Sequence, residues 1–257
     1  MKIWYQSGLN FERFKSYEQN LKNHIGKAAD TDTTVDIFGT SHGGTGVEYR
    51  FTEYLFTREI IENAFKAEEQ GYNAFTIGTT NDAGLFQARE VLNIPVIGIT
   101  QASMLVACMM GRNFSLIVPN EKMVPHFEEL TAKYGLKDRL ANITCTDFNI
   151  PQLGRIFDDP EMQSRQSEEF TRAVRESIQG GTEVIIPIGG IAGLFLAKSG
   201  LKQVDRVPII DTISAAVKMT EMMVNLGTFA GTFVSRRLSF ASPPDDVIKE
   251  LRQEYGI

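Results

Sequence analysis

Two short loops of small and polar residues are the segments of this sequence best suited to hold a negatively charged oxygen. The first is Gly78-Thr79-Thr80-Asn81-Asp82, and the second is Ile188-Gly189-Gly190-Ile191. Each lies between a strand-like apolar run and a helical pattern, so its backbone N–H groups are at the positive end of a helix. A carboxylate, an imide oxygen or an oxyanion suits such a place. The predicted ligand-binding residues in these loops are Thr80, Asn81, Gly189, Gly190 and Ile191.

His42 is the histidine best placed for general acid or base catalysis, because it lies in the glycine-rich segment 39–46. The ordinary pKa of histidine, about 6.5, suits that role. We predict two further catalytic residues: Thr79 as a donor to a developing oxyanion, and Asp82 as a second acid or base. The structural alternatives are a surface histidine in a flexible loop and, for Asp82, a helix cap.

The sequence contains no pattern of metal ligands. The histidines His24, His42 and His126 are far apart in the chain, and Cys108 and Cys145 form no zinc spacing or disulfide framework. Cys108 lies in the apolar stretch 104–110, so we interpret it as a small buried hydrophobic residue. Cys145 alternates like a strand residue and has the same interpretation. We therefore expect no bound metal.

Composition excludes several classes of protein. The chain has 257 residues, of which 42% are hydrophobic and 23% charged, and these fractions are typical of a folded globular protein. Its net charge of −6 provides no basic surface for nucleic acid. The longest uncharged apolar stretch, 104–110, is far shorter than the ~20 residues that cross a bilayer, and the first residues lack a signal peptide's apolar core. We expect a cytoplasmic protein that binds neither nucleic acid nor membrane.

Short β-branched or apolar runs alternate with longer amphipathic stretches, which is typical of an α/β fold with mostly parallel sheets. The helical patterns include 53–69 and 215–226, each with apolar residues on one face. The expected strands are 2–5, 34–38, 74–77, 95–99, 115–118, 142–146, 184–188 and 208–210.

A weak internal repeat relates two parts of the chain. Residues 74–98 and 184–211 both run from a strand through a small-residue loop and an Ala-Gly-Leu-Phe helix to a short strand. The repeat predicts two similar α/β lobes, each with a strand-end loop, and a site between them. We expect residues 1–99 plus 211–257 to form the first lobe and residues 100–210 the second.

Several of these segments resemble the aspartate/glutamate/hydantoin racemase superfamily, and the similarity is greatest to the hydantoin and allantoin racemase branch. The resemblance implies two lobes related by a pseudo-twofold axis, with a site between them that needs no metal and no cofactor. It also implies a small-molecule substrate and a homo-oligomer. The matching segments, in the order found in that superfamily, are 73–85, 88–90, 94–98, 101–103, 111–115, 184–190, 208–211 and 215–218.

The sequence departs from that superfamily at the residues that matter most for racemisation. Its members place one cysteine after a strand in each lobe, one to remove a proton from carbon and one to deliver a proton from the opposite face. The matching positions here hold Thr79 and Gly189. An alcohol is too weak an acid to act as a ready base near neutral pH, and glycine has no side chain, so two-thiol racemisation is excluded. Gln6 and Ser7 stand where the superfamily often has an Asn-Pro-Asn motif, and we predict that they bind substrate instead.

We therefore expect an enzyme that acts on a small carboxylate or cyclic amide by hydrolytic ring opening or a related cleavage, with His42 as the base. Two alternatives stay open. One is a proton-transfer isomerase, racemase or decarboxylase in which His42 and Asp82 replace the thiols. The other is a catalytically inactive protein that binds a small molecule in a pocket enlarged at Gly189. In the favoured case the oxyanion is held by Thr79, Thr80, Asn81 and the backbone of Gly189 and Gly190.

Overall fold

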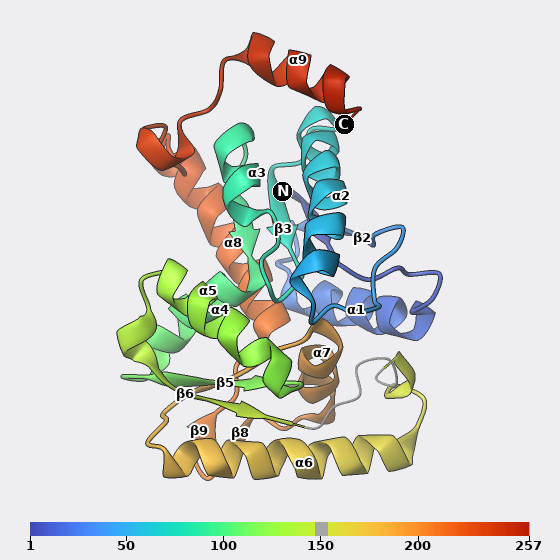
Figure 1. Cartoon of the computed structure of the whole chain (residues 1–257), viewed down its shortest axis with the longest axis vertical. Coiled ribbons are helices and arrows are strands. Elements are labelled where there is room, and N and C mark those ends of the chain that lie inside the picture. The colour runs from blue at the N-terminus through green and yellow to red at the C-terminus, as the bar shows by residue number, and fades with distance from the viewer. Residues whose placement is uncertain (147–153, 257) are drawn as a thin grey trace.

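The computed structural model of the chain describes residues 1–146 and 154–256. Two parallel sheets form its centre. The first sheet has the order β2-β1-β3-β4 and consists of β1 (Lys2–Gln6), β2 (Thr34–Phe38), β3 (Ala74–Ile77) and β4 (Val96–Gly98). The second has the order β6-β5-β7 and consists of β5 (Phe114–Val118), β6 (Leu140–Cys145) and β7 (Ile185–Pro187). Neighbouring strands in both sheets are parallel. The predicted α/β fold is confirmed, and Figure 1 shows the two sheets one above the other.

Helices connect and cover the strands. Their bounds are α1 (Lys15–Ala28), α2 (Arg50–Glu69), α3 (Leu85–Val91), α4 (Ile99–Met110), α5 (Val124–Lys133), α6 (Pro160–Gln179), α7 (Gly190–Ser199), α8 (Thr212–Ala230) and α9 (Asp245–Tyr255). Short 3₁₀ turns occur at Glu121–Met123, Lys137–Arg139 and Leu238–Phe240, and a two-stranded ribbon is formed by β8 (Gln203–Val204) and β9 (Val207–Pro208). Within residues 1–146 and 154–256, no helix combines the length and the apolar character needed to cross a membrane.

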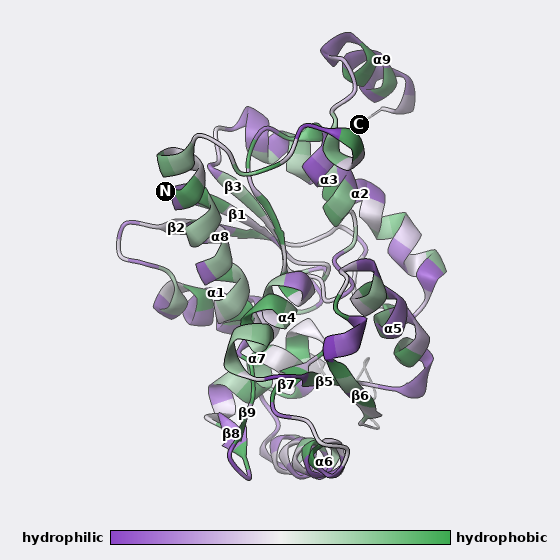
Figure 2. Cartoon of the chain, turned by 90° about the vertical axis from the view of Figure 1, so that its left-hand side faces the viewer, coloured by the Kyte–Doolittle hydropathy of each residue, from purple (hydrophilic) through white to green (hydrophobic). Residues whose placement is uncertain are grey.

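The strands are apolar because helices cover both faces of each sheet. Every residue of β3 is buried, and so is every residue of β5. Strands of a parallel sheet that is covered on both faces are typically near-continuous apolar runs, as these are. On the first sheet Trp4 also stacks on Phe38, with ring centroids 3.6 Å apart. Figure 2 shows β1 and β3 as hydrophobic elements between helices.

Near its C-terminus the chain returns to the first sheet through α8. Helix α8 packs against β3, β4, α1 and α4. The hydroxyl groups of Thr76 on β3 and Thr220 on α8 form a buried hydrogen bond of 2.8 Å. Asp211 caps α8, because its carboxylate accepts a hydrogen bond of 3.1 Å from the Ser214 N–H. The lobe boundaries at residues 99 and 211 stay a prediction.

The second sheet repeats the strand order of the first and then departs from it. Ile209 forms a parallel bridge with Ile185 of β7, at the place that β4 occupies beside β3. The strand predicted over 208–210 is thus reduced to this bridge at Ile209, and the neighbouring strand β9 ends at Pro208 and pairs antiparallel with β8. The ribbon turns at Asp205 and Arg206, whose φ angles of 48° and 70° are those of a type I′ turn. Such a turn usually contains Asn-Gly or Asp-Gly, and Asp205-Arg206 is not one of these signals.

Candidate functional site

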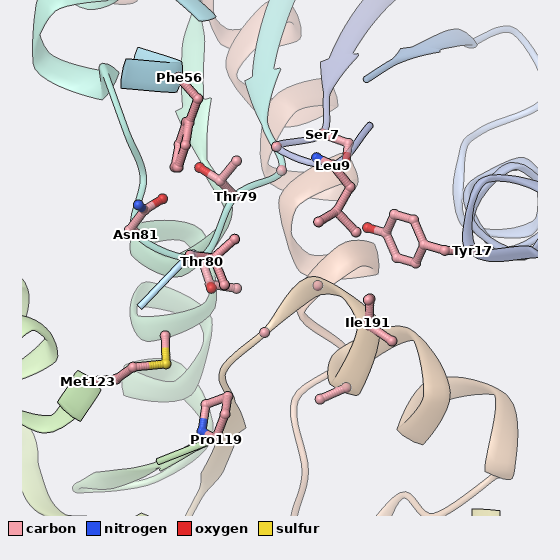
Figure 3. A pocket seen from close by; sticks show the side chains of 16 residues that line it. Ser7, Leu9, Tyr17, Phe56, Thr79, Thr80, Asn81, Pro119, Met123 and Ile191 are labelled. Atoms are coloured by element: carbon pink, nitrogen blue, oxygen red, sulfur yellow. Dashed lines mark hydrogen bonds between the residues drawn. The ribbon is translucent and has the colours of Figure 1, made fainter. Parts of the chain in front are cut away.

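A cavity of about 90 Å³ lies where loops from both sheets meet (Figure 3). Its walls come from the segments that follow β1, β3, β5 and β7, and the carboxyl ends of parallel strands are where α/β proteins bind ligands. The lining residues are Ser7, Gly8, Leu9, Tyr17, Val47, Phe56, Gly78, Thr79, Thr80, Asn81, Pro119, Met123, Gly189, Gly190, Ile191 and Ala192. The cavity therefore has room for a small molecule and takes its walls from both sheets.

The loop after β3 presents hydroxyl groups to the cavity. Gly78 starts the loop, and only glycine fits there because a Cβ would lie 2.3 Å from Cε1 of Tyr5. Thr79 is 9% exposed, and its Oγ1 has no hydrogen-bond partner although the atom is buried. Its methyl group packs on Gly8, where a Cβ would lie 2.4 Å from Cγ2 of Thr79. A buried hydroxyl that lacks a partner costs free energy, and a ligand in the cavity could supply that partner.

The loop after β7 presents backbone N–H groups. Gly189 has a φ of 114°, a conformation that favours glycine, and it immediately precedes α7. The N–H of Gly193 bonds to the carbonyl of Gly189 at 2.8 Å. The preceding N–H groups, those of Gly190, Ile191 and Ala192, have no acceptor in their own helix. The start of α7 also carries a partial positive charge.

Neutral groups surround the cavity. Among the described residues that line it there is no Asp, Glu, Lys, Arg, His or Cys, and Tyr17 is the ionisable side chain. Burial raises the pKa of Tyr17 to about 12, although a hydrogen bond from the Ser7 hydroxyl opposes that rise. Tyr17 is therefore a protonated donor at neutral pH. The arrangement favours an oxygen that carries negative charge, through neutral donors and a helix dipole.

The structure brings together most of the sequence-predicted binding residues. Seven of the predicted site residues line this cavity: Ser7, Thr79, Thr80, Asn81, Gly189, Gly190 and Ile191. Gln6, His42 and Asp82 do not line it. These three residues have other partners.

Gln6 is fully buried, and its side-chain amide forms hydrogen bonds with protein groups around the end of β1. Its Oε1 accepts hydrogen bonds from Trp4 Nε1 at 3.0 Å and Asn63 Nδ2 at 3.1 Å. Its Nε2 donates to the carbonyls of Ser7 and Gly39, both at 3.0 Å. The amide is satisfied by protein groups, so Gln6 supports the end of β1 and has no group left for a substrate.

His42 lies on the surface, on the solvent side of its loop. Its Nδ1 is 2.8 Å from Ser41 Oγ, and the Ser41 hydroxyl donates to Glu59 at 2.9 Å. The backbone of Gly43 approaches Gly8 so closely that a Cβ would lie 1.8 Å from the Gly8 carbonyl oxygen. The loop therefore turns its backbone toward the cavity and its histidine away from it, which removes the geometric basis for His42 as the base.

Asp82 anchors the hydroxyl-bearing loop to α4 and to Tyr134. Its buried carboxylate accepts hydrogen bonds from the backbone N–H groups of Thr100, at 3.0 Å, and Gln101, at 2.8 Å, in the first turn of α4. The Tyr134 hydroxyl donates to the same carboxylate at 2.6 Å. Gly98 makes room, because a Cβ there would lie 2.5 Å from Asp82 Cγ. Asp82 thus caps a helix and fixes a loop, and it does not face the cavity.

The stability of the fold is expected to depend on pH through Asp82. Burial raises the pKa of Asp82 from 3.8 to about 6, against the opposing effect of its three donors. The folded state therefore binds this proton more tightly than the unfolded state, so the stabilising contribution is complete below pH 4 and is lost as the pH rises through 6. The change corresponds to about 3 kcal/mol. Urea denaturation of wild type and Asp82→Asn between pH 4.5 and 7.5 should show the variant gaining stability relative to wild type as pH rises; a constant difference would contradict this.

Sequence reasoning missed Tyr17 as a cavity residue. Tyr17, Leu21 and Ile25 are spaced four residues apart and form the buried face of α1. That pattern is the ordinary signal of a core helix, and it cannot distinguish a tyrosine in the core from one at a cavity. The two cysteines lie elsewhere: Cys108 on α4 and Cys145 on β6 are both partly buried and do not line the cavity. In the part of the chain that the structure describes, no three His, Cys, Asp or Glu side chains are grouped so that they could hold a metal ion.

Comparison with known proteins connects this cavity with a family. The model of the family described as Asp/Glu/hydantoin racemase matches residues 12–220. A hydantoin racemase from Pseudomonas sp. (strain NS671) is 34% identical over 210 residues, which are 81% of each chain. A hydantoin racemase from Rhizobium meliloti is 31% identical over 81% of this chain and 80% of its own. In structure, an allantoin racemase from Klebsiella pneumoniae superposes with a TM-score of 0.82 and 25% identity, over 95% of this chain and 94% of that one.

These matches confirm the resemblance inferred from the sequence, including its hydantoin racemase-like character. They do not support hydrolytic ring opening, because the relatives are named racemases, and the position of His42 removes the base on which that expectation rested. With a family match that covers most of its length, this chain belongs to the Asp/Glu/hydantoin racemase family.

Proposed function

We propose that this protein is an isomerase that exchanges the proton on the carbon next to a carbonyl of a small cyclic amide of the hydantoin or allantoin class. The proposal is supported by the names of its relatives, hydantoin racemase and allantoin racemase. The observation that carries it is the cavity between the two sheets, where the loops after β3 and β7 bring hydroxyl and amide donors together.

Loss of a proton from such a carbon leaves negative charge on the neighbouring carbonyl oxygen. The hydroxyl groups of Thr79 and Thr80 and the N–H groups at the start of α7 are neutral donors for that oxygen. Leu9, Val47, Phe56 and Met123 supply apolar surface for a ring substituent. In this proposal the protein accelerates the reaction by stabilising the enolate.

The proton acceptor is not a thiol in this proposal. No cysteine is among the described lining residues, and an alcohol such as Thr79 is a poor base near neutral pH. Water or hydroxide from solvent therefore takes the proton from carbon, and solvent returns it to either face. The rate should accordingly rise with pH.

Proton NMR in heavy water with an enantiopure 5-substituted hydantoin tests the proposal. We expect the ring C–H signal to disappear faster with protein than in buffer, while the ring stays intact and optical rotation decays. Thr79→Val keeps the shape and removes the hydroxyl, and should lower the exchange rate about tenfold. Thr33→Val, which removes another buried hydroxyl without a partner but outside the cavity, should leave the rate unchanged. Appearance of a ring-opened product would contradict an isomerase.

A second candidate is a protein that binds a cyclic amide without converting it. The specific observation in its favour is that Tyr17, the ionisable side chain of the described lining, is protonated at neutral pH. Such a protein would be stabilised against heat by the ligand, because the ligand binds only the folded state, and would show no exchange at carbon. The NMR experiment and a thermal melt with the same compound distinguish the two functions.

A further inference from the structure

The Tyr17 side chain lines the cavity next to the first turn of α7. The side chain is 1% exposed, and a Cβ placed on Gly190 would lie 3.0 Å from the Tyr17 hydroxyl oxygen. Because Gly190 has no side chain, the hydroxyl lies close to the backbone of the first turn of α7. Figure 3 shows the Tyr17 hydroxyl pointing into the cavity, with Leu9 and Ile191 beside it.

Ser7 and Leu9 line the cavity together with Tyr17. The N–H of Leu9 donates to Ser7 Oγ at 3.2 Å. The neighbouring Ser7 hydroxyl opposes the effect of burial on the pKa of Tyr17. Tyr17 lines the cavity and is protonated at neutral pH, so its O–H can donate to a ligand.

Three kinds of donor belong to residues that line this cavity. The N–H groups of Gly190, Ile191 and Ala192 precede the first hydrogen bond of α7, a helix of 10 residues. Tyr17 adds a phenol, and Thr79 adds a buried hydroxyl that has no partner. An unpartnered, buried hydroxyl on the opposite loop is an independent indication that a polar ligand atom belongs here.

We propose that Tyr17 is an oxyanion-binding residue: together with the first N–H groups of α7 it binds the ligand oxygen that carries negative charge. The inference rests on the proposed function and deepens it, because it assigns the enolate oxygen a place next to Tyr17 and predicts a preference for the anionic form of a cyclic ureide over the neutral form. Tyr17 acts as a donor here and takes no proton from carbon.

Calorimetric binding of two ring compounds tests the assignment without relying on turnover. Barbiturate is a cyclic ureide that carries a delocalised enolate at neutral pH, and dihydrouracil is a neutral ureide with the same ring size. Wild type should bind barbiturate more tightly than dihydrouracil. Tyr17→Phe should weaken barbiturate binding about 10- to 100-fold, as expected for a hydrogen bond to a charged group, and should change dihydrouracil binding much less.

Tyr5→Phe is the matched control. Tyr5 is a second fully buried tyrosine, its hydroxyl has no partner, and it does not line the cavity. It should leave both affinities unchanged, and thermal melting of all three proteins verifies that each is folded. An equal loss for both ligands in Tyr17→Phe, no loss at all, or no preference for barbiturate in the wild type would overturn the assignment.

The result also separates this inference from the proposed function. If the selective loss occurs while no hydantoin exchanges its ring proton, the oxyanion site stands and the isomerase proposal fails. If exchange occurs and Tyr17→Phe lowers neither kcat nor the affinity for barbiturate, the isomerase stands and Tyr17 has no part in it. A drop in kcat with little change in KM would mark an interaction made mainly in the transition state.

Discussion

The double substitution Thr79→Cys/Gly189→Cys is expected to raise the rate of proton exchange at the ring carbon by about two to four orders of magnitude. A thiol has an ordinary pKa of about 8.5, so a useful fraction is thiolate near neutral pH, whereas an alcohol is a far weaker acid. The two positions are those where the resemblance implies the family's cysteines. Racemisation of an enantiopure 5-substituted hydantoin, followed by optical rotation, measures the effect.

The structure gives both thiols room. Thr79 lines the cavity and its buried hydroxyl has no partner, so a sulfur of similar shape breaks no hydrogen bond there. At Gly189 a Cβ would have Ala192 Cβ at 3.6 Å and Pro119 Cγ at 3.8 Å, which are ordinary contacts. The φ of 114° at Gly189 is strained for any other residue and should cost about 1–3 kcal/mol of stability. The variant should therefore melt at a lower temperature and still fold.

A shifted pair serves as the control. Thr80→Cys/Gly189→Cys carries the same chemical groups and the same strain at Gly189, and it moves the first thiol by one residue along the loop. It should gain little activity, because proton transfer to carbon depends strongly on where the sulfur lies. If the pair at 79 and 189 is folded and no faster than this control, the loops after β3 and β7 do not hold the reacting carbon between them.

Asp82→Ala is expected to lower the free energy of unfolding by about 3–5 kcal/mol and to weaken ligand binding in the cavity. The substitution removes one acceptor from three buried donors: the N–H groups of Thr100 and Gln101 and the hydroxyl of Tyr134. Asp82 also has a φ of 49°, which aspartate tolerates better than alanine. Urea denaturation at neutral pH measures the loss.

Asp159→Ala is the comparison for an ordinary helix cap. Asp159 accepts a single hydrogen bond of 3.0 Å, from the N–H of Met162 at the start of α6. Its replacement should cost about 1 kcal/mol. A cost for Asp82→Ala no greater than that for Asp159→Ala would mean that Asp82 is only a cap and that its hydrogen bond with Tyr134 adds little stability.

The sequence predicted the sheets and most of the cavity because both depend on short-range patterns. The apolar runs that became β1, β3 and β7 end in glycine or serine within two residues, and the loops that follow line the cavity. Small polar residues after a buried strand are a strong local signal for a site in an α/β fold. The homo-oligomer stays a prediction.

The same kind of reasoning could not assign roles that depend on contacts far apart in the chain. Asp82 was expected to be catalytic, but its carboxylate accepts a hydrogen bond from Tyr134, which lies 52 residues away in the sequence. Gln6 was expected to bind substrate, but its amide reaches Asn63 and Gly39. His42 lies in a loop that approaches the cavity through its backbone only. In each case the residue type suited the predicted catalytic or binding role, but tertiary packing directs the side chain to other partners or away from the cavity.

The return of α8 to the first sheet has a consequence for the order in which the chain acquires structure during synthesis. The ribosome releases β1 to β4 well before Thr220, which must be present before Thr76 can form its buried hydrogen bond. Until then the face of β3 and β4 that α8 covers lacks this helix. The second sheet, whose strands lie between residues 114 and 187, is therefore available to fold before the first sheet is fully covered. Cotranslational folding should then proceed from the middle of the chain outward, with the cavity formed last, when both sheets are in place.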